Sequence, residues 1–326
     1  MKKSVIKALV LVLAIATIVT CAISFSACSS TNTIGIIQFG THPSLQDCYD
    51  GMVEGLKEGL GEEFDTYNID LQNSNFESST SAAQAKSFKS KRVKIIGAIA
   101  TPSAMAAASA AKGKIPVVYC AVSDPKSAGL TEMKNVTGSS DLLDFDAQLA
   151  LIKAFIPTVS RIGVLYTTTE ENSKSQIKTL KEKAEALGIT IVEQAVTNAN
   201  EVPTATTTLI NKGIDCITNL TDNTVVGALK SVLERTDAAG IPVFGSEIDQ
   251  VKDGCIASAS LDYKALGKQT GLIMAKIIKG EEVASNDIAI QVKDSFNCYS
   301  AKVAAKFGIT VPESAGQNVD TTTTAA

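Results

Sequence analysis

The amino-acid sequence predicts an α/β protein built from two doubly wound parallel-sheet lobes joined by a hinge. Short apolar runs alternate strictly with helical segments, which is the pattern of a parallel sheet covered by helices. The alternation restarts near residue 161 and continues for a similar length. A chain of 326 residues is long enough for two lobes with separate cores. Two successive halves of similar size therefore indicate two lobes rather than one large sheet.

The clearest element of the first half is an apolar run at residues 94–99, which has the length and composition of a buried parallel strand. The run ends at Thr101 and Pro102, and a helix rich in small residues is expected from Ser103 to Ala111. Proline at the start of a helix, preceded by a hydroxyl residue, is a typical start signal. The other strands expected in this half are residues 33–39, 66–71 and 115–122, and the other helices are residues 45–60 and 79–90.

The second half repeats this order of elements. An amphipathic helix is expected at residues 173–187, and Gly188 is well placed to end it. The remaining strands are expected at residues 161–166, 189–193, 216–219 and 241–244, and the remaining helices at residues 204–211 and 223–238. The chain is then expected to cross between the lobes at residues 253–260, to form a long helix at residues 263–279 and to end with a strand at residues 288–292.

The N-terminus is interpreted as a bacterial lipoprotein signal that covers residues 1–27. Three lysines form a basic start, an apolar stretch follows at residues 8–23, and small residues stand directly before Cys28. Cys28 is expected to carry the lipid, and residues 28–33 are expected to form a short polar tether. The alternative interpretation is a signal anchor that is not cleaved.

The predicted lobe boundaries follow from the order of the elements. The first lobe is expected at residues 34–139, with a return segment at about 258–288. The second lobe is expected at residues 140–257, with a segment at about 289–312. Residues 313–326 are polar and low in complexity, so they are expected to form a disordered tail.

Composition and motifs argue against several classes of function. The formal net charge is −4, and it becomes −7 when the three lysines of the signal segment are removed, which argues against a nucleic-acid partner. One histidine, and cysteines scattered without a ligand spacing, argue against a metal site. No glycine-rich nucleotide motif and no nucleophile–base pair is found, so neither a cofactor nor enzymatic activity is expected. An exported hydrolase is the alternative from a different class.

Polar side chains recur where the predicted strands end or the next helices begin. In a parallel sheet such groups meet at one edge, where they can hold the polar ends of a small ligand, and a carboxylate there can balance an ammonium group. The same residue types also cap helices, so each position has this second interpretation. The candidate ligand-binding residues are Thr101, Ser103, Ser123, Asp124, Ser139, Asn172, Ser173, Asp222, Asn223 and Glu247, together with His42 in the first loop.

Several stretches taken together resemble the tryptophan/tyrosine-type ABC transporter substrate-binding proteins, a lipoprotein family of aromatic amino-acid binders. The matching segments are QFGTHPSL (38–45), AIATPSA (98–104), AVSDP (121–125), NVTGSSD (135–141), TDNT (221–224) and IPVFGSE (241–247). The resemblance implies a type I periplasmic-binding fold that clamps its ligand between two lobes. It also implies an ABC permease as the partner of a monomeric, lipid-anchored receptor on the outer face of the cytoplasmic membrane.

The resemblance also implies roles for the candidate residues. Thr101 and Ser103 would take the ligand carboxylate, and Ser123 and Asp124 would lie beside it. The ligand ammonium group would face Asp222 or Glu247. The ligand side chain would face His42, Phe39 and Tyr166.

The ligand expected from this resemblance is an amino acid, and specifically an aromatic one. The sequence departs from family usage at residues 39–41 and 167–170, which are loops that shape the pocket. The alternatives are another small solute, such as a sugar or a nucleoside, and a sensor subunit with a different membrane partner. The low aromatic content of 5% disfavours a sugar, because sugar-binding clefts are rich in stacked aromatic rings.

Overall fold

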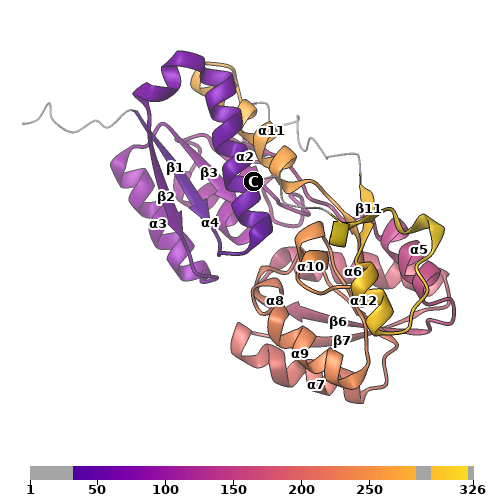
Figure 1. Ribbon diagram of the computed structural model, residues 1–326. Helices are drawn as coiled ribbons and strands as arrows, with labels where there is room; N and C mark the ends of the chain where they lie inside the picture. Colours follow the sequence, from indigo (N-terminus) through magenta and orange to yellow (C-terminus); the bar gives the residue numbers. More distant parts are fainter. Residues whose placement is uncertain (1–31, 284–294, 322–326) are drawn as a thin grey trace, which may run out of the picture.

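The computed structural model of the chain describes residues 32–283 and 295–321. These residues form two lobes that lie side by side along the molecule (Figure 1). Each lobe contains a parallel sheet with helices on both faces. The predicted fold class, two doubly wound parallel-sheet lobes, is therefore confirmed.

The first lobe is a five-stranded parallel sheet in the order β2-β1-β3-β4-β5. Both faces of its central strands are buried, which explains why their sequences are nearly continuous apolar runs. Helices α2 and α11 cover one face, and α3 and α4 cover the other. The strands are β1 (Thr33–Gln38), β2 (Asn68–Asn73), β3 (Ile95–Ile99), β4 (Val117–Cys120) and β5 (Val136–Gly138), and the helices are α2 (Pro43–Leu60), η1 (Gly61–Thr66), α3 (Ser78–Lys91), α4 (Thr101–Ala111) and α11 (Tyr263–Ile278).

The second lobe is a four-stranded parallel sheet in the order β7-β6-β8-β9. Helices α5 and α6 pack on one face, and α7 and α9 pack on the other. The strands are β6 (Arg161–Thr167), β7 (Thr190–Val196), β8 (Cys216–Thr218) and β9 (Val243–Phe244), and the helices are α5 (Phe145–Phe155), α6 (Glu171–Ala186), η2 (Ala199–Glu201), α7 (Val202–Asn211), α8 (Asn223–Gly227), α9 (Leu229–Ala239) and α10 (Ile248–Lys252).

A third, small sheet joins the last part of the chain to the second lobe. Strand β10 (Ala257–Ser260) pairs antiparallel with β11 (Phe296–Tyr299), and β11 pairs parallel with β12 (Gln317–Asn318). Helix α12 (Ala301–Lys306) and the short turns η3 (Glu313–Ala315) and η4 (Val319–Thr321) complete this region. The prediction of a disordered tail is wrong for residues 313–321, because these residues pair with β11 and bury Ala315 and Val319.

Several element boundaries also differ from the prediction. The helix expected at residues 223–238 is two helices, α8 and α9, which meet at Ala228. Helix α5 and strand β5 form where no helix or strand was expected. The strand expected at residues 288–292 lies within residues 284–294, outside the described part of the chain.

Helices α2 and α11 form the closest helix pair of the first lobe. A Cβ atom added to Gly51 or Gly55 would lie 2.1 Å from a backbone carbonyl oxygen of α11. Gly267 and Gly271 face α2 in the same way, at 2.2 and 2.1 Å from its backbone oxygens. The contacts advance in the same direction along both helices, so the helices are parallel and both begin at the side of the lobe that faces the second lobe. The glycines therefore fix the positions of two helix starts that lie 220 residues apart in the sequence.

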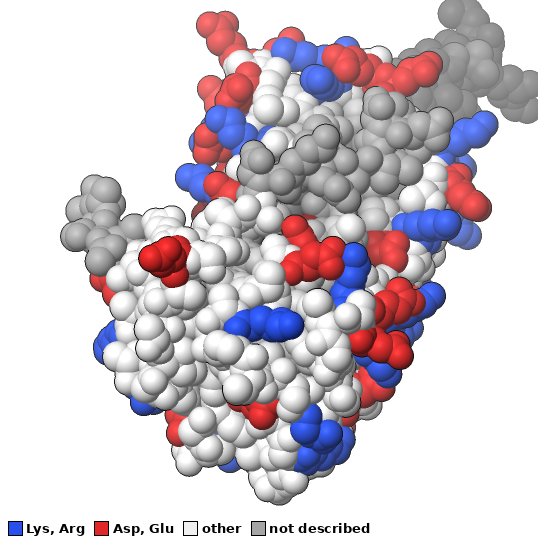
Figure 2. All heavy atoms as spheres, turned by 90° about the vertical axis from the view of Figure 1, so that its right-hand side faces the viewer, with Lys and Arg blue, Asp and Glu red and all other residues white. Residues whose placement is uncertain are grey.

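Charged side chains of both signs are interspersed over the upper lobe in the face shown in Figure 2, whereas large areas of the lower lobe carry no charge. Within the described residues, no helix has the length and apolar character needed to cross a membrane.

Candidate functional site

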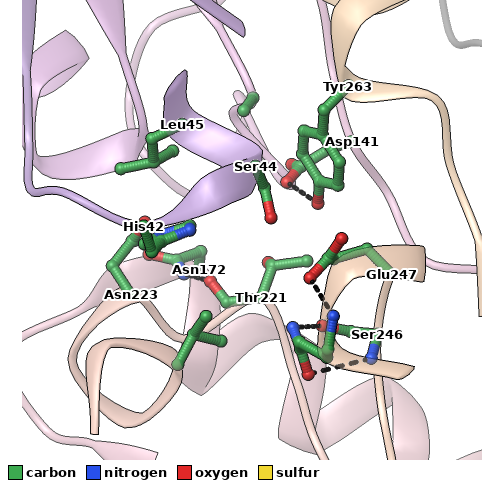
Figure 3. Close-up of a pocket in the computed structure, with 13 residues that line it drawn as sticks. His42, Ser44, Leu45, Asp141, Asn172, Thr221, Asn223, Ser246, Glu247 and Tyr263 are labelled. Carbon is green, nitrogen blue, oxygen red and sulfur yellow. Dashed lines mark hydrogen bonds between the residues drawn. The ribbon is translucent and has the colours of Figure 1, made fainter. Parts of the chain in front are cut away.

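A pocket lies between the two lobes (Figure 3). Its lining side chains nearly fill it, because the free volume inside is about 20 Å³, which is room for about one water molecule. Six lining residues come from the start of α2, the end of β4, the segment after β5 and the start of α11, and seven come from the second lobe. They are His42, Ser44, Leu45, Ala121, Asp141 and Tyr263, and Asn172, Thr221, Asn223, Val226, Ser246, Glu247 and Gln250.

Two carboxylates line the pocket, and none of its lining residues is a lysine or an arginine. Asp141 accepts hydrogen bonds from the Ser123 hydroxyl at 2.8 Å and from the Tyr263 hydroxyl at 3.0 Å. Burial raises the pKa of Asp141, and the two hydroxyl bonds oppose this shift. The pocket is therefore acidic and offers many neutral donors and acceptors around its two carboxylates.

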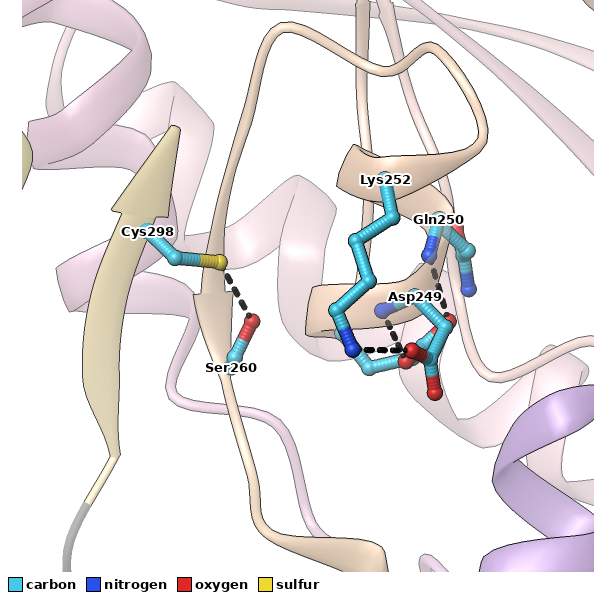
Figure 4. A network of polar contacts seen from close by, with 6 residues as sticks. Asp249, Gln250, Lys252, Ser260 and Cys298 are labelled. Carbon is cyan, nitrogen blue, oxygen red and sulfur yellow. Dashed lines mark hydrogen bonds and ion pairs between the residues drawn. The ribbon is translucent and has the colours of Figure 1, made fainter. Parts of the chain in front are cut away.

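The other carboxylate, Glu247, is held by its position before helix α10. It accepts hydrogen bonds from the backbone N–H groups of Asp249 and Gln250 at 2.7 and 2.8 Å, and Lys252 pairs with Asp249 at 2.6 Å (Figure 4). Burial raises the pKa of Glu247 to about 7, although the Ser44 hydroxyl of the first lobe also bonds to it. Glu247 therefore points into the space between the lobes from a fixed backbone (Figure 3).

The two lobes contact each other around the pocket through polar side chains. The ring nitrogen Nε2 of His42 lies 3.3 Å from Oδ1 of Asn223, and the hydroxyls of Ser123 and Thr221 lie 2.9 Å apart. Further from the pocket, a hydroxyl on α6 (Ser175) donates to Asp124 at 2.5 Å. These bonds show that the lobes are drawn together over the pocket.

His42 is neutral at pH 7 in this arrangement. The residue as a whole is only half-buried, but its Nδ1 is fully enclosed and has no hydrogen-bond partner within the described structure. Enclosure lowers the pKa of His42 to about 4, and the bond to Asn223 only partly offsets this. The ring therefore contributes an uncharged wall and one hydrogen-bonding nitrogen to the pocket.

Behind the second-lobe wall, two buried carboxylates organise the loops. Glu170 accepts from the backbone N–H groups of Asn223 and Thr224 and from both of their side chains, at 2.6 to 3.1 Å. Asp222 accepts from Thr167, Ser173 and Val225, at 2.6 to 2.9 Å. Burial, and then the nearby charge of Asp222, raise the pKa of Glu170 to about 7, whereas the four donated bonds favour its ionised form.

The structure brings four of the predicted ligand-binding residues into the pocket lining: His42, Asn172, Asn223 and Glu247. Ser123 is one hydrogen bond away, because it joins Asp141 to Thr221. Ser173 and Asp222 bond to each other behind the wall, and Ser139 bonds to Thr270 at 2.5 Å inside the first lobe. Asp124 lies at the interlobe contact with Ser175, and Phe39 packs edge-on against Phe76, with ring centroids 6.0 Å apart.

Thr101 and Ser103 lie at the start of α4, outside the pocket lining. Both hydroxyls are buried and have no hydrogen-bond partner within the described residues. The preceding residue, Ala100, has a φ of 77°, which is a strained conformation for a residue with a side chain. Strain and unpaired hydroxyls thus coincide at this strand end.

The site also contains residues that the sequence did not single out as ligand contacts. Ser44, Leu45 and Tyr263 come from the first turns of two first-lobe helices, and Ser246 and Gln250 come from the second lobe. Most of these residues fall within or beside the segments that resemble the substrate-binding family, which was the available signal. Glu170 had no such signal, since it lies in a loop that departs from family usage.

Neither metal ligation nor disulfide bonding accounts for the polar clusters of the site. Among the described residues, no group of three histidine, cysteine, aspartate or glutamate side chains could hold a metal ion. The cysteines of the described chain are free thiols, all of them buried. One of them, Cys298, lies 3.2 Å from the Ser260 hydroxyl in the third sheet (Figure 4).

The fold and the site together define a two-lobed solute-binding protein with its ligand pocket in the interlobe cleft. The family described as ABC transporter substrate binding protein matches residues 33–322, and the chain belongs to this family. The family resemblance expected from the sequence is thereby confirmed. Proteins of this family are the binding subunits of ABC transporters and work outside the cytoplasm.

Three relatives illustrate the similarity. A tyrosine-binding protein of Clostridioides difficile (strain R20291) is 35% identical over 80% of this chain and 76% of its own length. The structure of an ABC domain in complex with L-Trp from Streptococcus pneumoniae is 33% identical, covers 89% of this chain and 100% of its own, and superposes with a TM-score of 0.84. A ligand-free, open structure of a substrate-binding protein with adhesive properties from Clostridium difficile is 34% identical, covers 88% and 98%, and has a TM-score of 0.65.

Proposed function

We propose that this chain captures a free aromatic amino acid between its lobes and presents it to an ABC permease. The observation that carries the proposal is the charge of the pocket: it has two carboxylates, and no cationic side chain lines it. A ligand with an ammonium group satisfies the carboxylates, and Glu247 and Asp141 approach it from opposite lobes. We propose binding rather than catalysis, because one relative is named for binding tyrosine and another was solved in complex with L-Trp.

The neutral groups of the pocket suit the rest of an amino acid. Leu45 and Val226 provide apolar contacts for a ring, and Tyr263 adds an aromatic ring to the lining. Asn172 offers an acceptor to the ligand ammonium group, because its buried Oδ1 has no partner within the described residues while its amide nitrogen donates to the carbonyl of Thr221 at 2.8 Å. The unpaired hydroxyls of Thr101 and Ser103 are the candidates for binding the ligand carboxylate, since they are buried at a helix start.

The relatives support an aromatic ligand and a mechanism by hinge closure. One relative is named for tyrosine and another is bound to L-Trp. The two solved structures are equally similar to this chain in sequence, yet the L-Trp complex superposes with a TM-score of 0.84 and the open structure with 0.65. A difference in lobe placement explains this gap, so the arrangement described here corresponds to the closed state. A ligand that contacts both lobes shifts the population toward this state.

The test uses calorimetric titration and thermal unfolding of the chain that begins at Ser29. Every residue of the described hydrophobic clusters lies between Ile34 and Val319, so this chain keeps the whole core. A ligand at a hundred times its dissociation constant should stabilise it by about 2.7 kcal/mol. Tyrosine or tryptophan is expected to bind. Tyramine, which lacks the carboxylate, and 3-(4-hydroxyphenyl)propionate, which lacks the ammonium group, are expected to bind far more weakly. Binding of a sugar or nucleoside instead would refute the amino-acid assignment.

We further propose that the mature protein is a monomer anchored by a lipid on Cys28, at the outer face of the cytoplasmic membrane. The basic start, the apolar stretch and the small residues before Cys28 support this proposal. Replacing Cys28 with alanine should release the protein from the membrane fraction. A variant that stays membrane-bound would favour the uncleaved anchor. The lobe boundaries given above stay predictions.

A further inference from the structure

The edge of the first sheet that points away from the second lobe carries a cluster of basic residues, named here the basic edge. All five strands of this sheet are parallel, so the segments that lead into β3 and β4 come together at one edge. The basic edge consists of Lys89, Arg92, Lys94, Lys112 and Lys114. Lys89 is half-buried, and the other four are exposed.

A shallow hollow in the basic edge has a purely basic and apolar lining. Four of its six lining residues are Lys89, Arg92, Lys94 and Lys114, and the other two are Val93 and Ile115. No carboxylate lines it. The hollow therefore combines positive charge with a small apolar floor, which suits an anionic group attached to a hydrocarbon.

The basic edge lies beside the point where the chain enters the fold. The backbone N–H of Lys94 donates to the carbonyl of Thr33, the first residue of β1, at 2.8 Å. Thr33 comes five positions after Cys28, and a fully extended chain of that length spans at most about 18 Å. A lipid on Cys28 would thus hold the basic edge close to the membrane surface.

The acidic groups near this edge do not cancel its charge. Asp70 pairs with Lys91, at 2.7 Å. Glu62, Glu63 and Asp65 belong to η1, which precedes β2, and β2 lies on the opposite side of β1 from β3 and β4. These three acidic residues therefore lie on the β2 side of the edge, whereas Glu132, in the segment before β5, is the acidic residue on the β4 side. Charges of the distant second lobe are screened, since the Debye length at physiological ionic strength is about 8 Å.

We propose that the basic edge binds the anionic phospholipid headgroups of the membrane to which the chain is tethered. The lipid surface is favoured over any other anionic partner because the segment that leads to Cys28 joins the fold at this edge. Docking in this way places the starts of the strands against the membrane. Their carboxyl ends, with the pocket and the second lobe, then face outward, where solute arrives. The orientation of the pocket away from the membrane rests on the proposed lipid anchor. The contact between the basic edge and the headgroups can be measured without the anchor.

The test is sedimentation of the chain that begins at Ser29 with vesicles of phosphatidylcholine, either pure or containing phosphatidylglycerol. Binding to the anionic vesicles alone, weakening as salt rises, is expected. Each basic side chain near an anionic surface strengthens binding about fivefold, so the triple variant K89Q/K94Q/K114Q should bind on the order of a hundredfold more weakly. The matched control, K178Q/K230Q/K302Q, removes three exposed lysines of the second lobe and should bind as the unaltered chain does.

Equal binding to neutral vesicles, or equal loss in both triple variants, would overturn the proposal. Unchanged thermal unfolding and amino-acid binding in K89Q/K94Q/K114Q would show that the variant is folded. The chain that begins at Ser29 lacks Cys28, so the outcome of the vesicle experiment is independent of lipidation. If the Cys28→Ala experiment fails while the vesicle experiment succeeds, only the anchor is refuted.

Discussion

The glycine contact between α2 and α11 makes the sharpest prediction about stability. Gly55→Ala would place a Cβ atom 2.1 Å from the carbonyl oxygen of Lys268 and 2.9 Å from the amide nitrogen of Leu272. Both are backbone atoms, so no side chain can turn away and the two helices have to separate. Gly59→Ala meets a different obstacle, the Cβ atom of Ala275 at 2.4 Å.

The size of the effect follows from two opposing terms. Alanine in a helix interior is about 1 kcal/mol more favourable than glycine. Overpacking a buried contact costs roughly 1–3 kcal/mol, and the upper end applies here because the obstacle is rigid backbone. Gly55→Ala is therefore expected to lower the free energy of unfolding by about 1–2 kcal/mol. For an ordinary helix position the same substitution would raise it.

Gly59→Ala supplies an internal control, because its obstacle can be removed. In the double variant Gly59→Ala/Ala275→Gly, one methyl group moves from α11 to α2 and the helix-propensity terms cancel. The double variant should unfold within about 0.5 kcal/mol of the unaltered chain, while each single variant is less stable. Urea unfolding of the chain from Ser29 measures the unaltered chain and the four variants. Increased stability of Gly55→Ala, or failure of Ala275→Gly to rescue Gly59→Ala, would refute the proposed close contact.

Three further predictions concern the pocket and its strand ends. Glu247→Gln should weaken tyrosine binding about 10- to 100-fold in calorimetric titration, as expected for losing a charged hydrogen bond, whereas Glu182→Gln on the exposed face of α6 should have no effect. Burial raises the pKa of Glu170 and of Glu247 to about 7 from 4.5, so their contribution to stability is complete below pH 4.5 and is lost as the pH rises through 7. The melting temperature of the free chain should therefore fall between about pH 4.5 and 7 and level off above pH 7. Glu170→Gln should flatten this slope, and an unchanged slope would contradict the assignment. Ala100→Gly should raise the free energy of unfolding by about 1 kcal/mol in urea titration because it relieves a φ of 77°, and a loss of stability would show that the residue is not strained.

The fold could be predicted because its signals are local. The strand at residues 94–99 and the helix start at Thr101 and Pro102 are visible in the sequence, and the structure has β3 and α4 there. The break between α8 and α9 was missed because residues 223–238 contain no proline, and Gly227 is their only helix-breaking residue. The ordered tail was missed because β12 is stabilised by pairing with β11, and a non-local pairing of two residues has no signature in a polar sequence.

The site could be predicted only in part, for a related reason. A polar residue at a strand end either faces the ligand or bonds to a neighbouring loop, and the sequence is the same in both cases. Asp222 was expected to face an ammonium group, yet three neighbours from its own lobe saturate it. Tyr263 was not expected, because its place in the pocket depends on α11 returning to the first lobe from more than 100 residues further along the chain.

The two walls of the pocket are held by different physical means, and this determines where a ligand can move the structure. The first-lobe wall is fixed by backbone contact, since α2 and α11 touch at their glycines and carry Ser44 and Tyr263 at their starts. The second-lobe wall is fixed by hydrogen bonds to Glu170, which hold Asn223 in place from behind. Neither wall can deform cheaply, because the first would lose close packing and the second would leave a buried carboxylate without donors. The free energy of ligand binding therefore has to act on the contacts between the walls, such as the interlobe bonds between His42 and Asn223 and between Ser123 and Thr221.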